Sequence, residues 1–212
     1  GNAKYTVQRS KGLGENDPEM MSLIEEMMVV EAVRIHDGRK RFVEELVPVF
    51  SQFHTTITGG NEHVGLRYRS HMNEGNLADT LAASRADDRA LGYTSKGTHR
   101  DELVMQLGGY PLKKEGSQGQ NKSYLVALKL AQFDFLHQCS NETPILLLDD
   151  IFDKLDSRRV EQIVKLVSGE RFGQIFITDV NRDHIDTILD CTDGSYKLFE
   201  VIDGAAQLIK EK

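Results

Sequence analysis

The sequence predicts an α/β fold in which a mainly helical segment precedes alternating strands and helices. Residues 145–148 (Ile-Leu-Leu-Leu) form a wholly apolar run that ends at two aspartates, as a strand buried on both faces of a parallel sheet does. Residues 174–178 form a second run of this kind, and apolar residues between and after the two runs recur at helical spacing. Strands and helices that alternate in this order are typical of α/β proteins.

The composition is that of a globular protein. The 212 residues are 39% hydrophobic and carry a formal net charge of -7. Such an acidic chain offers no overall basic surface, so contact with nucleic acid needs a local basic patch or another chain. No apolar run approaches the roughly 18 residues of a membrane helix, and no leader pattern stands at the start. We therefore expect no membrane contact and a cytoplasmic location. Because the first residue is Gly1, we also expect a missing upstream part.

Cysteine and histidine spacing argues against a disulfide framework or a metal site. Cys139 and Cys191 lie far apart without C-x-x-C spacing, so we expect two free thiols in a reducing compartment. Four histidines of the first half also lack metal-ligand spacing: His36, His54, His63 and His71.

The first half predicts helices around one strand. Helical spacing over residues 18–53 predicts one long helix or two in series, with Asp17-Pro18 as the start signal. Residues 64–69 alternate as a strand does, and a second helix is expected over residues 77–91.

The second half predicts a hairpin and then the α/β elements. Residues 103–107 alternate, Gly108-Gly109 makes a turn, and residues 110–112 form the return strand. Helices are expected over residues 124–137, 160–166 and 185–189.

The two acids after the apolar run indicate nucleotide chemistry. Asp149 would emerge at the carboxyl end of a parallel strand, the edge where α/β sheets bind ligands. A carboxylate there suits Mg²⁺, which takes one or two carboxylates together with waters and nucleotide phosphates. Asp150 would orient or deprotonate an attacking water. Two acids can also simply end a strand, but the surrounding motifs favour a Walker B motif.

A phosphate-binding loop should accompany a Walker B motif, and one segment imitates it. Residues 116–123 differ from G-x-x-x-x-G-K-[ST] only at Asn121, where the second glycine is required. That glycine lets the backbone approach a phosphate, and the loop must leave an apolar strand, whereas residues 111–115 make a poor one. A degenerate P-loop stays open as the alternative.

A different arrangement explains the same segment. The run G-S-Q-G-Q precedes a predicted helix, the strand with its two acids follows, and a run ending in Leu-Asp comes next. ABC-type ATPases carry an L-S-G-G-Q signature, a Walker B strand and a D-loop in this order. The G-S-Q-G-Q variant, the Asp149-Asp150 pair and residues 94–102 resemble the RecF family of bacterial DNA-repair ATPases over most of the chain.

The resemblance implies the C-terminal half of an ABC-type P-loop ATPase head, preceded by a mainly α-helical arm segment. Residues 1–92 would belong to the arm domain, and residues 93–212 would be the half of the head that carries the signature, Walker B and D-loop. The Walker A loop would lie in the missing part. We therefore expect the complete protein to be a DNA-dependent ATPase and this chain alone to be inactive.

The resemblance also implies roles for single residues. Asp149 would hold the Mg²⁺ and Asp150 would activate the water. The signature would contact ATP bound by a second subunit, so a homodimer would form only with ATP. The signature residues that make this contact would be Ser117, Gln118, Gly119 and Gln120. The D-loop would consist of Asp153, Lys154, Leu155 and Asp156. The complete protein would bind DNA at single-strand/double-strand junctions and help a recombination-mediator protein to load recombinase at gaps.

Some positions depart from the ABC pattern. Gly116 and Gln118 replace a leucine and a glycine of the signature. Asp150 replaces a glutamate, which predicts slow turnover or a base that acts through a bridging water. Asp179 follows the last strand where these ATPases carry a switch histidine, so it becomes the switch candidate, and His184 lies too far along to align. Apart from these departures, His99 and Arg100 could line a nucleotide or DNA interface, although a salt bridge from Arg100 to an acid is the simpler expectation.

Two other functions remain open. Another SMC-like ATPase head would share these motifs but needs a long coiled coil, and the helices show no sustained heptads. A non-catalytic interaction fragment is the second alternative.

Overall fold

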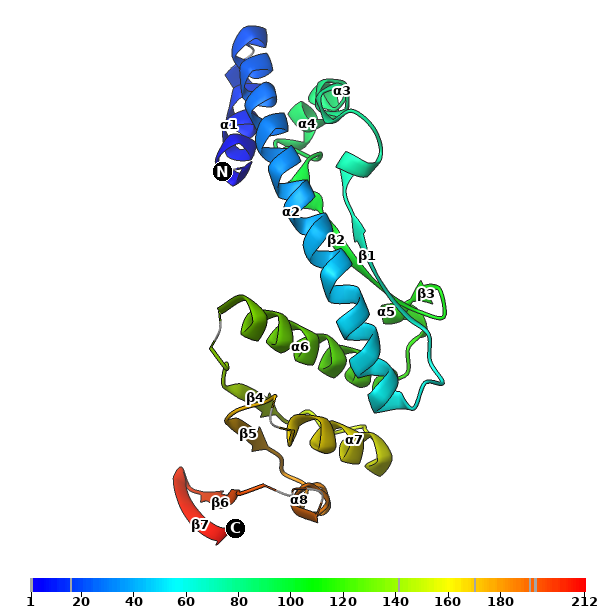
Figure 1. Cartoon of the computed structure of the whole chain (residues 1–212). Coiled ribbons are helices and arrows are strands. Elements are labelled where there is room, and N and C mark those ends of the chain that lie inside the picture. The colour runs from blue at the N-terminus through cyan, green and yellow to red at the C-terminus, as the bar shows by residue number, and fades with distance from the viewer. Residues whose placement is uncertain (1, 16, 141, 170, 191, 193) are drawn as a thin grey trace. The chain divides into compact units, whose positions relative to one another are not determined.

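The computed structural model describes residues 2–15, 17–140, 142–169, 171–190, 192 and 194–212 (Figure 1). The chain forms two compact units, the first of Gly1–Val47 and Gly65–Gln106 and the second of Pro48–Val64 and Leu107–Lys212. These two compact units do not test the predicted division into an arm domain (residues 1–92) and half of an ATPase head (residues 93–212), which stays a prediction. No described helix is long and apolar enough to cross a membrane.

The first unit is mainly helical. Its elements are α1 (Asn2–Glu15), the first part of α2 (Pro18–Thr58), β1 (Val64–Arg69), η1 (His71–Asn73), α3 (Leu77–Ala83), α4 (Arg85–Leu91), η2 (Thr98–Arg100) and β2 (Glu102–Leu107). Its core gathers small and long apolar side chains of α2 and α3: Ile24, Met28, Ala32, Leu77 and Leu81.

Helix α2 decides between the two alternatives predicted for this segment, because it is one long helix and not two in series. Asp17 caps its start, because Asp17 Oδ1 accepts hydrogen bonds from the amides of Glu19 and Met20, both at 3.0 Å. The helix continues through Pro48 to Thr58. It ends at Gly59, whose φ of 76° suits a residue without a side chain and whose amide donates to the Thr55 carbonyl at 2.9 Å.

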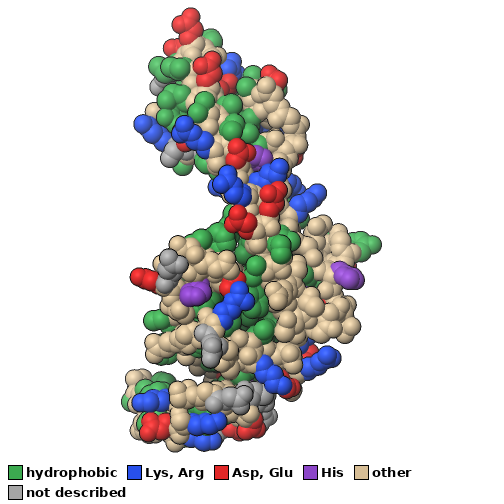
Figure 2. All heavy atoms as spheres, viewed as in Figure 1, with side chains coloured by type: hydrophobic (Ala, Val, Ile, Leu, Met, Phe, Trp, Pro, Cys, Tyr) green, Lys and Arg blue, Asp and Glu red, His purple; other side chains and the backbone are tan. Residues whose placement is uncertain are grey.

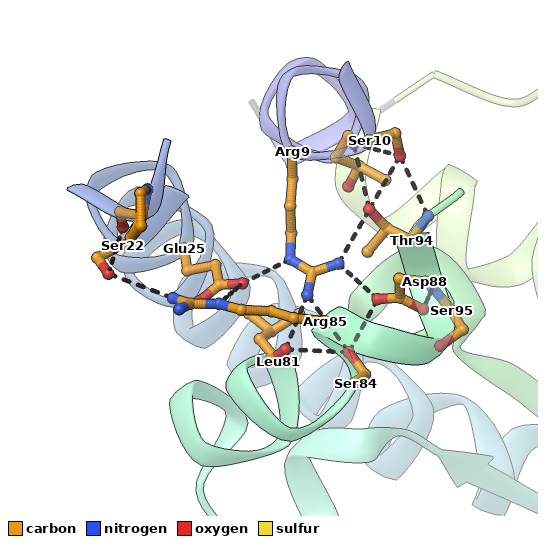
Figure 3. A network of polar contacts seen from close by, with 12 residues as sticks. Arg9, Ser10, Ser22, Glu25, Leu81, Ser84, Arg85, Asp88, Thr94 and Ser95 are labelled. Carbon is orange, nitrogen blue, oxygen red and sulfur yellow. Dashed lines mark hydrogen bonds and ion pairs between the residues drawn. The ribbon is translucent and has the colours of Figure 1, made fainter. Parts of the chain in front are cut away.

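Helix α1 was not predicted, and a buried arginine attaches it to the first unit (Figure 3). Arg9 is fully buried. Its guanidinium donates to Glu25 Oε1 at 2.8 Å, to Asp88 Oδ2 at 2.5 Å and to the Leu81 carbonyl at 2.7 Å. The charge of Arg9 is thus compensated by acids of α2 and α4, as a buried charge requires.

The single helix predicted over residues 77–91 is wrong, because the segment forms two helices that meet at Ser84. The Ser84 hydroxyl donates to the Leu81 carbonyl at 3.0 Å and bonds to Asp88 Oδ2 at 2.8 Å. Short polar side chains that bond to nearby backbone in this way compete with helix continuation. The second helix ends at Gly92, which has a φ of 74°.

The predicted hairpin is present but shorter on its return side. β2 and β3 (Tyr110–Pro111) join β1 in a three-stranded sheet, and the turn residues Gly108 and Gly109 have φ values of 57° and 84°. Leu112 does not continue the strand. It is buried and begins the short helix α5 (Leu112–Glu115).

The second unit confirms the α/β prediction. Its remaining elements are α6 (Gln118–Ser140), β4 (Leu146–Asp149), α7 (Ser157–Val167), β5 (Ile175–Thr178), α8 (Arg182–Asp190), β6 (Lys197–Ile202) and β7 (Ala205–Glu211). β4 and β5 pair in parallel, with Leu146 opposite Ile175 and Asp149 opposite Thr178. Their carboxyl ends therefore meet at one edge, and the two predicted buried runs are neighbouring strands (Figure 1).

The prediction that the first of these strands is buried on both faces is wrong for the described chain. Leu146 and Leu148 are buried at 7% and 5% exposure, whereas Leu147 is 70% exposed and its register partner Phe176 is 52% exposed. One face packs on aromatic and aliphatic side chains. The buried members of this unit include Phe50, Tyr124, Leu130, Phe152, Val160, Ile163 and Phe172.

The chain closes with a hairpin that was not predicted. β6 and β7 pair antiparallel around Asp203-Gly204, whose φ values are 50° and 79°. Asp-Gly between alternating apolar residues is a strong hairpin signal, so the sequence carried this element. Of the two cysteines expected to be free, Cys139 is an exposed free thiol and Cys191 lies outside the described residues.

Candidate nucleotide site

The two predicted Walker B acids stand at the exposed carboxyl edge of β4. Asp149 accepts a hydrogen bond from the hydroxyl of Thr178, its register partner at the end of β5. The Asp150 amide donates to the Thr178 carbonyl at 3.2 Å. Asp150 has a φ of 47°, a left-handed conformation that aspartate tolerates better than most residues. Both acids are exposed, so they are free to meet a ligand at the sheet edge.

The oxygen groups at this edge fit Mg²⁺ only together with a ligand. No three His, Cys, Asp or Glu side chains converge on a metal site in the part of the chain that is described. Asp149 supplies one carboxylate and Thr178 one hydroxyl beside it. Mg²⁺ is usually held by one or two carboxylates plus waters and phosphates, so this donor set suits the ion of a bound nucleotide.

The signature segment begins a helix earlier than the sequence predicts. Helix α6 starts at Gln118, six residues before the predicted start at Tyr124. Ser117 Oγ accepts from the Gln120 amide at 3.2 Å, and Gln120 Oε1 accepts from the Ser117 amide at 2.9 Å. This reciprocal pair is a capping box. It fixes the start of α6, where the N–H groups of Gln118 and Gly119 stand at the positive end of the helix.

The same segment argues against the P-loop alternative. Helix α5 precedes Gly116, so the strand that a P-loop must leave is absent among these described residues. Asn121, which occupies the position of the second P-loop glycine, instead donates from Nδ2 to the carbonyls of Gly116 and Ser117 at 2.8 and 2.9 Å. Its amide holds the turn between α5 and α6.

The predicted D-loop lies against the signature helix. A Cβ on Gly119 would meet the Lys154 carbonyl oxygen at 3.1 Å, so the two segments are in close contact. Leu155 is 8% exposed and anchors the loop, and Lys154 has a φ of 66°. Asp156 Oδ1 accepts from the Arg159 amide at 2.9 Å and thereby caps α7, while Asp153 is exposed.

A lysine connects the signature helix to the acid pair. Lys122 Nζ donates to the Asp150 carbonyl at 2.8 Å. Together with the contact of Gly119 and Lys154, this bond brings the three predicted motifs into one neighbourhood of the second unit. Their order in the sequence is therefore matched by proximity in space.

Asp179 is engaged by a histidine that the sequence reasoning set aside. Asp179 Oδ2 lies 3.0 Å from His184 Nδ1, and Oδ1 accepts from the Asn181 amide at 2.7 Å. The Asp179 side chain is only 2% exposed. The turn at Asn181 and the start of α8 bring His184 back to the end of β5, a proximity that alignment by sequence position misses. The switch role of Asp179 stays a prediction.

His99 and Arg100 belong to the first unit and border a shallow groove of about 360 Å³. The Arg100 guanidinium lies over the Tyr93 ring, 5.2 Å from its centroid, and His99 Nε2 lies 2.8 Å from the Thr94 carbonyl oxygen. The salt bridge expected for Arg100 is not among the contacts of the described residues. Lys11 of α1 lines the same groove.

Comparison with known proteins assigns the family. The sequence is 55% identical over 212 residues to the DNA replication and repair protein RecF of Phocaeicola vulgatus, a match that covers 98% of this chain and 57% of that protein. RecF of Bacteroides thetaiotaomicron is 53% identical over 204 residues, covering 95% of this chain and 55% of that protein. The chain belongs to the RecF family. It spans little more than half the length of these relatives, and no protein-family model matches it.

Solved structures confirm the fold. The chain superposes with a TM-score of 0.75 on a structure of the recombination mediator protein RecF-ATPrS in the RecFOR pathway, at 24% identity and over 99% of this chain and 57% of that one. A structure from work on ATP-driven dimerisation of SMC ATPases matches with a TM-score of 0.51 at 15% identity, over 82% of this chain and 87% of that one. The predicted class, half of an ABC-type head with a helical arm, is thus correct for this RecF-family chain.

Proposed function

We propose that the full-length protein is a DNA-repair and recombination ATPase of the RecF type that binds ATP with Mg²⁺ and dimerises on ATP. The observation that carries this proposal is the convergence of signature, D-loop and acid pair, through the Gly119–Lys154 contact and the Lys122–Asp150 hydrogen bond. The names of the RecF relatives support the repair role.

The chemistry divides between two subunits. Asp149 would hold the Mg²⁺, which neutralises charge that develops on the phosphates, and Asp150 would orient or deprotonate the attacking water. The hydroxyl of Ser117 and the amides of Gln118 and Gly119 would contact the γ-phosphate of ATP bound by the partner subunit, because the start of a helix binds anions. The ATP itself would be held by the part of the protein outside this chain.

Partners are proposed from the matched proteins. The solved RecF structure is described as a recombination mediator in the RecFOR pathway, and the SMC structure comes from a study of ATP-driven dimerisation. We extend both to this protein: an ATP-dependent homodimer that acts in the bacterial cytoplasm with a recombination-mediator protein, at single-strand/double-strand junctions, to help load recombinase at gaps.

The groove of the first unit is the proposed DNA contact. Acidic and basic side chains are interspersed on the face shown in Figure 2, so the proposal rests on the groove's own lining. Lys11 and Arg100 would neutralise backbone phosphates.

The substitution Asp150→Asn in the full-length protein tests the proposed function. It removes the proposed base but keeps Asp149, so ATP affinity should stay within about twofold while hydrolysis falls about a hundredfold or more. An ATP-bound dimer should accumulate, as measured by light scattering. Asp149→Asn is the matched contrast and should weaken the Mg²⁺ dependence of ATP binding. If Asp150→Asn instead lost ATP binding and hydrolysed normally at saturating ATP, Asp150 would be a metal ligand and the assignment wrong.

A further inference from the structure

One arginine joins the signature helix to the D-loop. Arg159 lies in the first turn of α7, and its side chain is 19% exposed. Arg159 Nη1 donates to Ser123 Oγ at 2.7 Å and to the Gly119 carbonyl at 3.3 Å. Its Nε lies 3.1 Å from Asp156 Oδ2, the last residue of the D-loop. A single planar guanidinium therefore contacts the signature helix, which we propose to face the partner's nucleotide, and the D-loop, which lies against that helix.

The remaining nitrogen of this guanidinium reaches the segment after α2. Arg159 Nη2 donates to Glu62 Oε1 at 2.8 Å. Glu62 follows the C-terminal end of α2 at Thr58, after the Gly59-Gly60 turn. The other carboxylate oxygen, Oε2, lies 3.5 Å from Nε2 of His54, a fully buried residue of α2. Arg159 thus ties the two motifs to the end of α2.

Arg159 is the cation paired with the Glu62 carboxylate. Burial lowers the pKa of His54, an effect that the neighbouring Arg159 strengthens and Glu62 opposes. His54 is therefore neutral near pH 7 and does not compensate the Glu62 carboxylate. Arg159 is the cation that does, within a half-buried site where an uncompensated charge is costly.

We propose that Arg159 is a positioning residue: it fixes the spacing of signature and D-loop, and through Glu62 it makes that spacing depend on the end of α2. This inference rests on the proposed function, because it assumes that the signature meets a partner's ATP. Arginine suits the task, since its rigid fork bonds several acceptors at once, whereas lysine has a single flexible ammonium.

The test compares Arg159→Met, Arg159→Lys and Glu62→Gln in the full-length protein. ATP affinity of the monomer should stay within about twofold, because Arg159 contacts no residue proposed to hold the subunit's own nucleotide. ATP-dependent dimerisation should weaken about tenfold or more in Arg159→Met, the loss expected for charge-assisted hydrogen bonds. Arg159→Lys should be intermediate. The double variant with Glu62→Gln should dimerise no worse than Arg159→Met, because the two residues share one interaction.

A neighbouring arginine provides the control. Arg158→Met removes the same charge from the same helical turn, at an exposed position. The Arg158 guanidinium lies beside Gly59 at the end of α2, so this variant tests whether that neighbourhood alone matters, and it should dimerise like the wild type. The inference is overturned if Arg159→Met dimerises normally, or if its dimerisation falls only in step with melting temperature and monomer ATP affinity, as a merely structural role requires. Ser117→Arg, measured in parallel, distinguishes a failure of the role proposed for Arg159 from a failure of the signature assignment. If it abolishes dimerisation while Arg159→Met does not, only the role of Arg159 is wrong; if neither variant affects dimerisation, the signature assignment itself fails.

Discussion

Two glycines of the signature segment allow contacts that a side chain would prevent. A Cβ on Gly116 would stand 2.8 Å from the Leu112 carbonyl oxygen, and one on Gly119 would stand 3.1 Å from that of Lys154. The first contact favours glycine at the position where the L-S-G-G-Q signature has leucine. The second shows that the D-loop backbone lies so close to the start of α6 that a residue larger than glycine at position 119 would crowd it.

The proposed DNA groove gives a prediction for single charges. Lys11→Gln and Arg100→Gln in the full-length protein should each weaken DNA binding and lower the slope of log affinity against log salt by about one, because each removes one phosphate contact. Lys40→Gln, an exposed position of the same unit, is the control and should leave the slope unchanged. If all the variants give the same slope, the groove is not part of the DNA-binding surface.

At the level of elements, a buried ionic network holds α1 to its unit. Arg9 bonds Glu25 of α2 and Asp88 of α4, and Arg85 Nη2 lies 2.6 Å from Glu25 Oε2 (Figure 3). The Ser95 amide also donates to Asp88 Oδ1 at 3.0 Å. Asp88 therefore joins α1, α4 and the loop that leads to the groove.

Asp88→Asn should destabilise the first unit by about 3 kcal/mol, since it leaves the buried Arg9 with one acid fewer. Asp87→Asn, on the exposed neighbouring position, should change stability little. Chemical unfolding followed by circular dichroism measures both. A loss for Asp88→Asn no larger than that for Asp87→Asn would contradict the role of the network.

The same network predicts a pH dependence. Burial raises the pKa of Asp88, but hydrogen bonds from Ser95, Arg9 and Ser84 outweigh it and hold the pKa below its usual 3.8. A depressed carboxyl pKa stabilises the fold above the unfolded value, and this stabilisation is lost as the pH falls through the folded value. The stability difference between wild type and Asp88→Asn should therefore shrink as the pH falls below 3.8.

Hydrophobic periodicity predicted the elements that have a regular apolar spacing or an unbroken apolar run. Helix α2 and the strands β4 and β5 follow directly from spacing. Helix α1 did not, because its attachment is a buried arginine, Arg9, and not an apolar stripe. The break at Ser84 depends on a side-chain bond to Asp88, which spacing alone does not reveal.

At the scale of the molecule, motif order singled out the segments of the candidate site but not the residues that support them. The signature, the acid pair and the D-loop were proposed from the sequence; the structure brings these segments together, and their roles stay predictions. Thr178, Arg159 and His184 were not assigned roles, because each reaches the site through the fold: across the β4–β5 pair, from the first turn of α7 and from α8. Neighbours of this kind belong to no local pattern.

One face of the β4–β5 pair is exposed in this chain. Leu147 and Phe176 are apolar, exposed and in register, and the chain spans only 57% of the Phocaeicola vulgatus relative. The expectation that this chain alone does not hydrolyse ATP stays a prediction. It follows from the proposal that a Walker A loop lies outside these residues.

The central claim is that the signature contacts ATP bound by another subunit, and Ser117→Arg in the full-length protein tests it most directly. Ser117 stands exposed at the start of α6, where a guanidinium would collide with an opposing phosphate loop. Ser140→Arg, at the exposed far end of the same helix, is the matched control. Nucleotide titration and light scattering on one preparation should find unchanged monomer affinity for ATP and no ATP-dependent dimer for Ser117→Arg alone. A dimer that forms normally, or a monomer that no longer binds ATP, would contradict the account.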